Sequence, residues 1–227
     1  MKGYGQFCPI AKASEIVSER WTNLVIRELI AGSESFNDLR RGLPLMSPAL
    51  LSTRLKSLEA AGVVERHVDG ANVSYRLSEA GLELKPIILQ LGVWGHRWAR
   101  THYEKEDLDP SMLMWDIHRS IDVDYFPKKD RTVITFEFTE YTNQLRFWWL
   151  VITRGEVDVC MKDPGYNVDL AIATDLQTLT MIWMGDISLM KALREKRFAI
   201  TGNTTLKKDI PVWLGTNYFA DVKPARK

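Results

Sequence analysis

Hydrophobic positions in the first sixty residues recur mainly at helical spacing. Every third or fourth residue is apolar in three successive segments, each closed by a glycine, and this pattern predicts three helices. The predicted helices cover residues 8–31, 35–42 and 47–62. The third helix opens with Ser47 followed by Pro48, a pairing that is favoured at helix N-termini. Its end at Gly62 is also a favoured stop for a helix.

The pattern then changes from helical to alternating. Residues 63–68 and 73–77 alternate apolar with polar side chains, and Asp69-Gly70 between them favours a tight hairpin. A long helix is predicted over residues 78–103, where apolar residues return to helical spacing. A short helix, a turn, a further helix and a hairpin form the layout of a winged helix-turn-helix.

The charged segment 104–110 ends in Asp-Pro and separates two kinds of pattern. We interpret it as the boundary between an N-terminal domain, residues 1–105, and a C-terminal domain, residues 110–227. In the second domain the predicted elements are strands at 132–141, 145–153, 156–161, 169–173 and 197–201, and helices that start near 175, 188 and 204. The predicted fold class is α+β: a winged helix-turn-helix domain followed by an α+β domain with a mostly antiparallel sheet covered by helices.

Length and composition fit this two-domain interpretation. The chain has 227 residues, of which 45% are hydrophobic and 26% charged, as in globular proteins. No apolar run is long enough to span a membrane, and the first residues show no basic start followed by an apolar core. The two cysteines, Cys8 and Cys160, lie far apart and form no CxxC pair. These features predict a cytoplasmic protein with no membrane partner.

The third helix has one apolar side and one polar side, as a helix that recognises DNA needs. If Leu51, Leu55 and Leu58 anchor it to the other helices, its remaining side faces outward. Small hydroxyl-bearing residues near a helix N-terminus can then meet base edges, whereas Lys and Arg bind phosphates. With the hairpin, the predicted DNA-contacting residues are Ser47, Pro48, Ala49, Ser52, Thr53, Arg54, Lys56, Arg66, Asn72 and Arg76. The alternative is a small helical bundle whose Arg54 and Lys56 are merely solvated.

Several blocks of sequence in this domain also resemble one known family. They are Cys8-Pro9, Arg20-Trp21-Thr22, Ile26 to Leu29, Phe36 to Arg41, Leu43-Pro44, Leu51 to Gly62, Tyr75 to Gly81 and Trp94 to Trp98. In this order they resemble the HxlR-type winged-helix regulators, which are relatives of the MarR group. The resemblance implies a homodimer on a palindromic operator in double-stranded DNA, with the first and last helices of the domain at the dimer seam. Ser18-Glu19 departs from the glycine-rich pair that is common there.

Cys8 carries a second expectation from the same resemblance. In some members of this family, a cysteine at the Cys-Pro position senses electrophiles or oxidants. Such a role needs an exposed thiolate with a lowered pKa, and Lys12 lies one turn later. The alternative is an inert, half-buried cysteine. We therefore retain Cys8 as a candidate redox sensor.

The second domain is rich in aromatic residues. Leu145, Phe147 and Trp149 share one face of a predicted strand, while Trp148 and Leu150 share the other. A strand that is apolar on both faces is typical of a covered sheet or of one wall of a cavity. With the soft side chains of the following helix, the predicted ligand-binding residues are Phe147, Trp149, Met181, Trp183 and Met184. The alternative is an aromatic core that holds no ligand.

The second domain also resembles a known fold family, on shorter motifs. They are Asp163 to Gly165, Asp169-Leu170, Thr174 to Leu179, Trp183 to Asp186, Ala192-Leu193, Thr201-Gly202 and Trp213-Leu214. Together they look like a sterol carrier protein type 2-like domain. The resemblance implies a hydrophobic tunnel for fatty acyl or sterol-like molecules. Domains of this class also serve as plain dimerisation or regulatory modules.

Catalytic chemistry has no support in the sequence. There is no HExxH motif, no glycine-rich phosphate loop and no GxSxG elbow, so we expect no catalytic residues, no metal and no cofactor. The function predicted is that of a DNA-binding transcriptional regulator, a homodimeric repressor controlled by an apolar molecule in its second domain. The rival interpretations are a lipid carrier whose winged helix serves protein contacts, and an enzyme that uses the cavity of the second domain.

Overall fold

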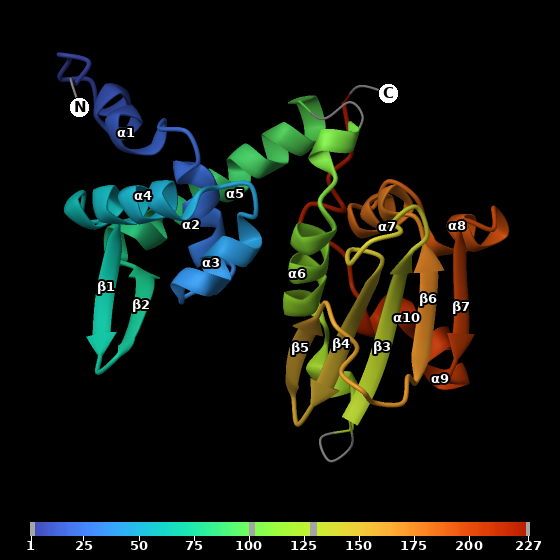
Figure 1. The fold of residues 1–227 in the computed structure, drawn as a ribbon. Coiled ribbons are helices and arrows are strands. Elements are labelled where there is room, and N and C mark those ends of the chain that lie inside the picture. Colours follow the sequence, from blue (N-terminus) through green and yellow to red (C-terminus); the bar gives the residue numbers. More distant parts are fainter. Residues whose placement is uncertain (1–2, 100–102, 128–130, 226–227) are drawn as a thin grey trace. The chain divides into compact units, whose positions relative to one another are not determined.

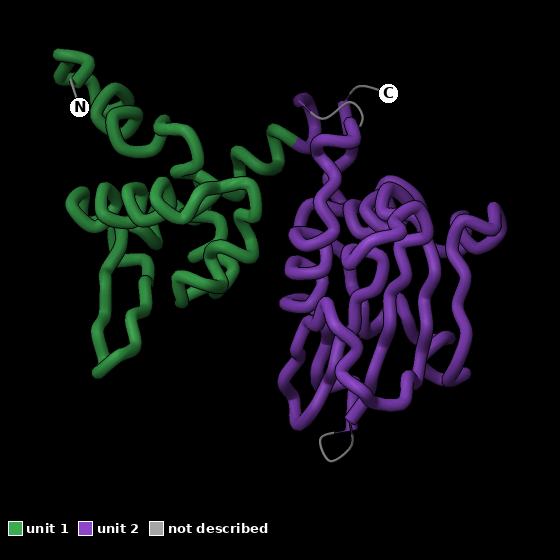
Figure 2. Tube along the Cα trace, in the orientation of Figure 1, with its two compact units in different colours: residues 1–95 green, residues 96–227 purple. Residues whose placement is uncertain are grey.

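A computed structural model describes residues 3–99, 103–127 and 131–225. The chain divides into two compact units, residues 1–95 and residues 96–227 (Figure 2). The first unit ends within a helical segment, earlier in the chain than the charged segment 104–110 that the sequence pattern indicated as the boundary. Each unit encloses its own hydrophobic core.

The first unit is mainly helical (Figure 1). Its elements are α1 (Pro9–Val17), α2 (Thr22–Ile30), α3 (Phe36–Gly42), α4 (Pro48–Ala60), β1 (Val64–Asp69), β2 (Asn72–Leu77) and α5 (Glu79–Trp94). The two strands pair antiparallel as a hairpin, and its turn contains Gly70 at a φ of 57°. The predicted order of helices and hairpin from residue 35 to residue 77 is therefore present.

The single helix predicted over residues 8–31 is wrong, because the chain forms two helices there. Trp21, directly before α2, has a φ of 78°, a left-handed conformation that cannot continue a right-handed helix. The Trp21 ring packs against the core of the unit, and the guanidinium of Arg20 lies 5.7 Å from its centroid. None of the residues of α1 is buried.

The long helix predicted over residues 78–103 ends earlier as a regular α-helix. After Trp94 the backbone continues as η1 (Gly95–Ala99), which is a π-helical turn. Isolated π-helical turns of this kind are often found at functional sites. Residues 100–102, the next part of the prediction, lie outside the described residues.

The second unit contains a mixed sheet. Its elements are η2 (Lys105–Asp107), α6 (Pro110–Ser120), η3 (Val123–Tyr125), β3 (Arg131–Phe138), β4 (Phe147–Thr153), β5 (Glu156–Cys160), β6 (Leu170–Thr174), α7 (Leu176–Trp183), α8 (Leu189–Arg194), β7 (Phe198–Gly202), α9 (Thr204–Lys208) and α10 (Ile210–Trp213). Within the described residues the strand order is β5-β4-β3-β6-β7. The pair β3 and β6 is parallel, and the other pairs are antiparallel.

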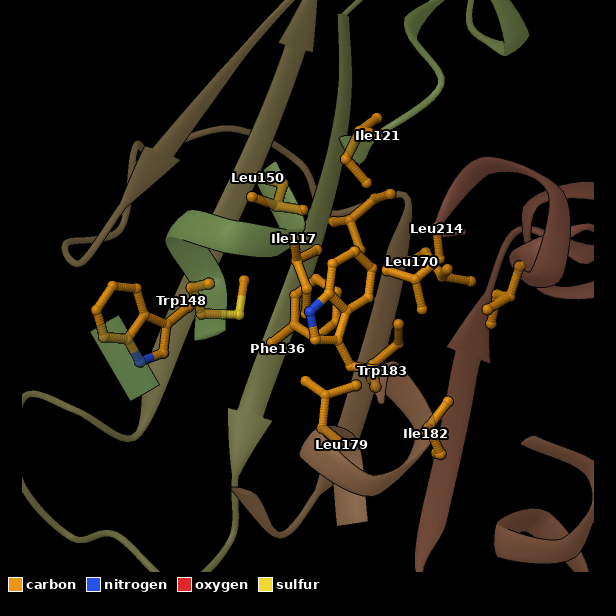
Figure 3. Close-up of a cluster of buried hydrophobic side chains, with 14 of the residues drawn as sticks. Ile117, Ile121, Phe136, Trp148, Leu150, Leu170, Leu179, Ile182, Trp183 and Leu214 are labelled. Atoms are coloured by element: carbon orange, nitrogen blue, oxygen red, sulfur yellow. The ribbon is translucent and has the colours of Figure 1, made fainter. Parts of the chain in front are cut away.

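One face of this sheet packs against helices. Alternate strand residues such as Phe136, Leu150 and Ile172 are buried there together with side chains of α6, α7 and α10. Figure 3 shows Trp183 of α7 within this cluster, close to Ile117 of α6 and Phe136 of β3. The helix α6 is an element that the sequence pattern missed, although Asp109 caps it and Pro110 occupies its first position.

The opposite face of the sheet carries a different set of side chains. The register of β4 with β5 places Trp149 beside Cys160, Val151 beside Asp158 and Thr153 beside Glu156. The edge strand β5 therefore presents two exposed carboxylates, those of Glu156 and Asp158, on this face.

The end of α8 provides a test of backbone strain. Lys196 is exposed and has a φ of 58°, at the position after the helix cap where glycine is preferred. We expect Lys196→Gly to raise the free energy of unfolding by about 0.5 to 1 kcal/mol, because glycine has no Cβ to strain this conformation.

The matched control is Lys191→Gly, on an exposed lysine within α8 itself. This change should lower the free energy of unfolding by about 1 kcal/mol, because glycine disfavours a helix interior. Urea denaturation of both variants measures the two effects, and equal destabilisation by both would contradict the prediction.

Candidate nucleic-acid interface

The buried carboxylate of Glu28 fixes how α2 meets α3. Glu28 is fully buried, and it accepts hydrogen bonds from Arg27 Nη2 at 2.7 Å and from Ser33 Oγ at 3.1 Å. The same Arg27 nitrogen donates to the carbonyl oxygen of Gly42 at 3.0 Å. A Cβ atom at Gly42 would collide with the Glu28 carboxylate, so any side chain there would push the carboxylate out of its hydrogen bonds. The end of α3, and with it the turn before α4, is thus held against α2.

The helix α4 is anchored as its spacing predicts. The side chain of Ser47 caps its N-terminus by accepting a hydrogen bond from the Leu50 amide at 3.3 Å. Leu51, Leu55 and Leu58 are buried in the core of the unit. Because these three side chains point inward, the opposite side of α4 faces solvent.

That outer side carries most of the predicted DNA-contacting residues. Pro48, Ala49, Thr53 and Lys56 are exposed, and Ser52 is half-buried. The Thr53 hydroxyl donates to the carbonyl oxygen of Ala49 at 2.9 Å, and it keeps its lone pairs for a base-edge donor. The outer side of α4 therefore offers small polar side chains in its first two turns and one lysine, Lys56, directly after them.

Arg54 does not belong to this outer side. Its side chain is only 14% exposed; its Nη2 lies 2.7 Å from the Glu19 carboxylate, and its Nε donates to the Arg20 carbonyl oxygen at 3.1 Å. The residue sits where the apolar and polar sides of the helix meet, and the turn between α1 and α2 captures it. This marginal position is the one expected from the sequence, and the guanidinium is engaged within the protein, so a DNA contact by Arg54 stays a prediction.

The hairpin residues are exposed, as expected for a wing. Arg66, Asn72 and Arg76 all lie at the surface. Arg76 donates to the Glu34 carboxylate at 2.9 Å, and this hydrogen bond raises the pKa of the guanidinium. Such exposed ion pairs contribute little stability, so the pair can exchange for a phosphate at small cost.

Two further arginines were not assigned a role from the sequence. Arg40 and Arg41 are exposed in the last turn of α3, and Arg41 Nη1 lies 3.3 Å from Asp38. In helix-turn-helix proteins, the helix before the recognition helix crosses the phosphate backbone. The basic pair directly before the turn was the sequence feature that could have identified them.

The two cysteines differ in their surroundings. Cys8 is half-buried directly before α1, and the Lys12 ammonium is engaged with both Glu15 carboxylate oxygens at 3.1 Å. The ammonium of Lys12 thus pairs with the Glu15 carboxylate and not with Cys8. Burial, followed by the charge of Asp158, raises the pKa of the Cys160 thiol. A redox role for Cys8 remains a prediction.

The five predicted ligand-binding residues do not come together. Phe147 and Trp149 lie on the sheet face opposite to the helices, with ring centroids 6.1 Å apart. Trp183 is a core residue on the other face, and its Nε1 donates to Asp116 at 3.0 Å. Met181 and Met184 also pack against that core. The cavity predicted between these side chains is therefore wrong, because odd-numbered residues of β4 project away from α7.

Taken together, the helix pair held by Glu28, the exposed side of α4 and the hairpin define a winged helix-turn-helix domain. The profile of the HxlR-like helix-turn-helix family matches residues 16–103 of this chain. The HTH-type transcriptional regulator YvaP of Bacillus subtilis is 36% identical over 112 residues, which are 48% of this chain and 95% of that protein. The regulator YybR of the same organism is 34% identical over 91 residues, which are 39% of this chain and 73% of that protein.

Among solved structures, the reduced form of the transcriptional regulator YodB from B. subtilis is 30% identical and covers 40% of this chain and 92% of its own, with a TM-score of 0.36. That score is too low for a structural argument. From the family profile and the identity with YvaP, the chain belongs to the HxlR-like helix-turn-helix family. It is a DNA-binding transcriptional regulator. Within the described residues, no helix has both the length and the apolar character needed to cross a membrane.

The position of Lys56 allows a direct test of the interface. We expect Lys56→Ala to weaken binding to all DNA sequences and to reduce the slope of log K against log salt by about 1, because one phosphate contact is lost. Fluorescence anisotropy titrations at several salt concentrations measure both quantities.

Lys162→Ala, on an exposed lysine of the second unit, is the control and should leave the salt slope unchanged. A slope that is equal in wild type and Lys56→Ala would remove Lys56 from the interface.

Proposed function

We propose that this regulator is a homodimeric repressor that binds a palindromic operator and is controlled by a small apolar molecule bound in its second unit. The exposed side of α4 carries the DNA half of the proposal, since the described helix-turn-helix offers no other helix with a buried leucine stripe and a small, polar outer side. Membership of the HxlR-like helix-turn-helix family supports the same function.

The homodimer is supported by an apolar surface on α5. Ile87, Leu91 and Trp94 are 61%, 49% and 57% exposed, and Leu82 lies exposed one to three turns earlier. Large apolar side chains grouped on one helix mark interaction surfaces. In a two-fold dimer, the two α4 helices would lie about 34 Å apart, or a multiple of this distance, along the DNA. Trp98 of η1, also exposed, would extend the seam.

The proposed dimer interface on α5 can be tested by placing a charged side chain on it. We expect Trp94→Arg to convert a dimer into a monomer at micromolar concentration, because a guanidinium would then face the apolar surface of the partner. Analytical ultracentrifugation reports the mass. Leu45→Arg is the control, since Leu45 is 73% exposed outside α5, and it should stay dimeric. A monomeric wild type would contradict the homodimer, and a dimeric Trp94→Arg would place the seam elsewhere.

An apolar groove in the second unit supports the proposed control by a small apolar molecule. The groove lies elsewhere than the cavity that the sequence predicted. The groove has a volume of about 860 Å³, which is within the range of small-molecule sites. Its walls come from α7, α8, β7, α9 and α10 and the residues that follow these elements. Ile182, Leu189, Leu193, Ile200, Ile210 and Leu214 supply most of the apolar surface.

The charges at this groove indicate the chemical class of the ligand. Among the described residues that line it, the charged ones are Lys207 and Lys208, both on α9. The Lys207 ammonium donates to the Ile200 carbonyl oxygen at 3.3 Å, which holds it at the groove wall. An apolar body with one anionic end therefore fits the groove best.

A sterol carrier protein type 2-like architecture of the second unit would agree with this use. The unit combines a sheet that is covered by helices on one face with an apolar groove beside the edge strand β7. We propose this relationship on the sequence motifs and on the groove.

Binding can be tested with two amphiphiles of opposite charge. We expect dodecanoate to raise the melting temperature and dodecyltrimethylammonium to raise it less, because only the carboxylate pairs with Lys207 and Lys208. At a free concentration of about 100 times Kd, the ligand adds about 2.7 kcal/mol to the stability of the native state. Differential scanning fluorimetry measures the shift.

Two variants locate the site. Leu193→Trp should fill part of the groove and reduce the shift in melting temperature caused by dodecanoate. Met161→Trp places a tryptophan at an exposed methionine outside the groove and should leave that shift unchanged. A full shift in Leu193→Trp would place the ligand elsewhere.

The same groove favours a second candidate function, a lipid carrier whose winged helix serves protein contacts. Gel-shift titration against the promoter of its own gene separates the two. Salt-dependent DNA binding supports the regulator, and transfer of dodecanoate between vesicles without DNA affinity supports the carrier.

A further inference from the structure

The C-terminal segment 215–225 forms part of the groove and then continues away from it. Leu214, Gly215 and Thr216 line the groove at the point where the chain leaves α10. Gly215 has a φ of 66°, a conformation in which a residue with a side chain would be strained. The chain thus leaves the groove through a backbone conformation that glycine adopts without strain.

The next residue, Asn217, is fastened at several atoms. Its amide donates to the Trp183 carbonyl oxygen at 2.8 Å, its Nδ2 donates to Asp116 Oδ2 at 3.1 Å, and its Oδ1 accepts from the Phe219 amide at 3.0 Å. The Asp116 carboxylate also accepts from Trp183 Nε1 at 3.0 Å and from Arg119 Nη2 at 2.7 Å. One carboxylate thus ties α6, α7 and the C-terminal segment together.

Two further contacts fix the course of the segment. A Cβ atom at Gly185, directly after α7, would lie 2.5 Å from the Ala220 carbonyl oxygen, so the segment runs in direct contact with the end of that helix. At its far end, the Ala225 amide donates to the Arg97 carbonyl oxygen at 2.9 Å. Arg97 belongs to η1, the π-helical turn that continues α5.

We propose that segment 215–225 is a strap that transmits occupancy of the groove to η1, with Asn217 as its fixed point. A molecule packed against Leu214 to Thr216 favours one backbone arrangement at Gly215. Because Asn217 is held by Asp116 and Trp183, that preference acts on the rest of the strap and on the Ala225–Arg97 hydrogen bond. This regulation rests on the ligand site proposed above, and it acts on the helical segment that follows the proposed dimer surface.

The mechanical part is tested on the full chain without any ligand, by hydrogen–deuterium exchange and mass spectrometry. We expect Asn217→Ala to speed exchange about tenfold in residues 217–225 and in 95–99, because the hydrogen bonds at the fixed point are lost. Unchanged exchange in β3 and β4 shows that the variant is folded. The control is Lys223→Ala, on an exposed residue of the same strap, and it should exchange as wild type does. Wild-type exchange at 95–99 in Asn217→Ala overturns the proposal.

The coupling is tested by adding dodecanoate. In wild type it should slow exchange at 95–99, whereas in Asn217→Ala it should still raise the melting temperature but no longer protect 95–99. Dodecanoate that binds wild type without changing exchange at 95–99 overturns the coupling and leaves the ligand site standing. Absence of dodecanoate binding overturns the ligand site and the coupling that rests on it, whereas the ligand-free comparison separately decides the role of Asn217.

Discussion

The DNA-binding unit depends on one buried charge. Removing Glu28 would take away the buried carboxylate that accepts from both Arg27 and Ser33, and the loss of such a buried partner is more costly than the loss of an exposed ion pair. A side chain at Gly42 would displace this carboxylate. The path of α3, the turn after it and therefore the exposed side of α4 all follow from this constraint. Residues that never meet DNA thus decide how the interface is presented.

Much of the first unit could be predicted because its determinants are local. The cap at Ser47, the leucine spacing of α4 and the Asp69-Gly70 turn are each determined by residues that are close together in the sequence. The features that the sequence did not predict are conformations and contacts of single residues that depend on residues elsewhere in the chain. Periodicity alone cannot reveal that Trp21 takes a left-handed backbone, or that the partner of Arg54 is the Glu19 carboxylate.

The second unit shows the limit of the same approach. Alternation identified the strands and divided their residues between two faces, but it could not say which face the helices would cover. Asp109-Pro110 was interpreted as a boundary although the same pair starts α6. The apolar groove joins residues from α7, β7 and α10, which meet only after the sheet has formed. Sites that are assembled from distant segments leave no periodic trace.

The edge strand β5 has a consequence for how copies of this protein can meet. An edge offers unpaired backbone groups to any other strand, and inward or like charges are a common means of preventing such growth of a sheet. If two copies aligned their β5 strands, the carboxylates of Glu156 and Asp158 would be brought against each other on one face. Pairing of two copies through β5 is thereby disfavoured by like charge, whereas β7, the other edge of the sheet, carries no such pair of carboxylates.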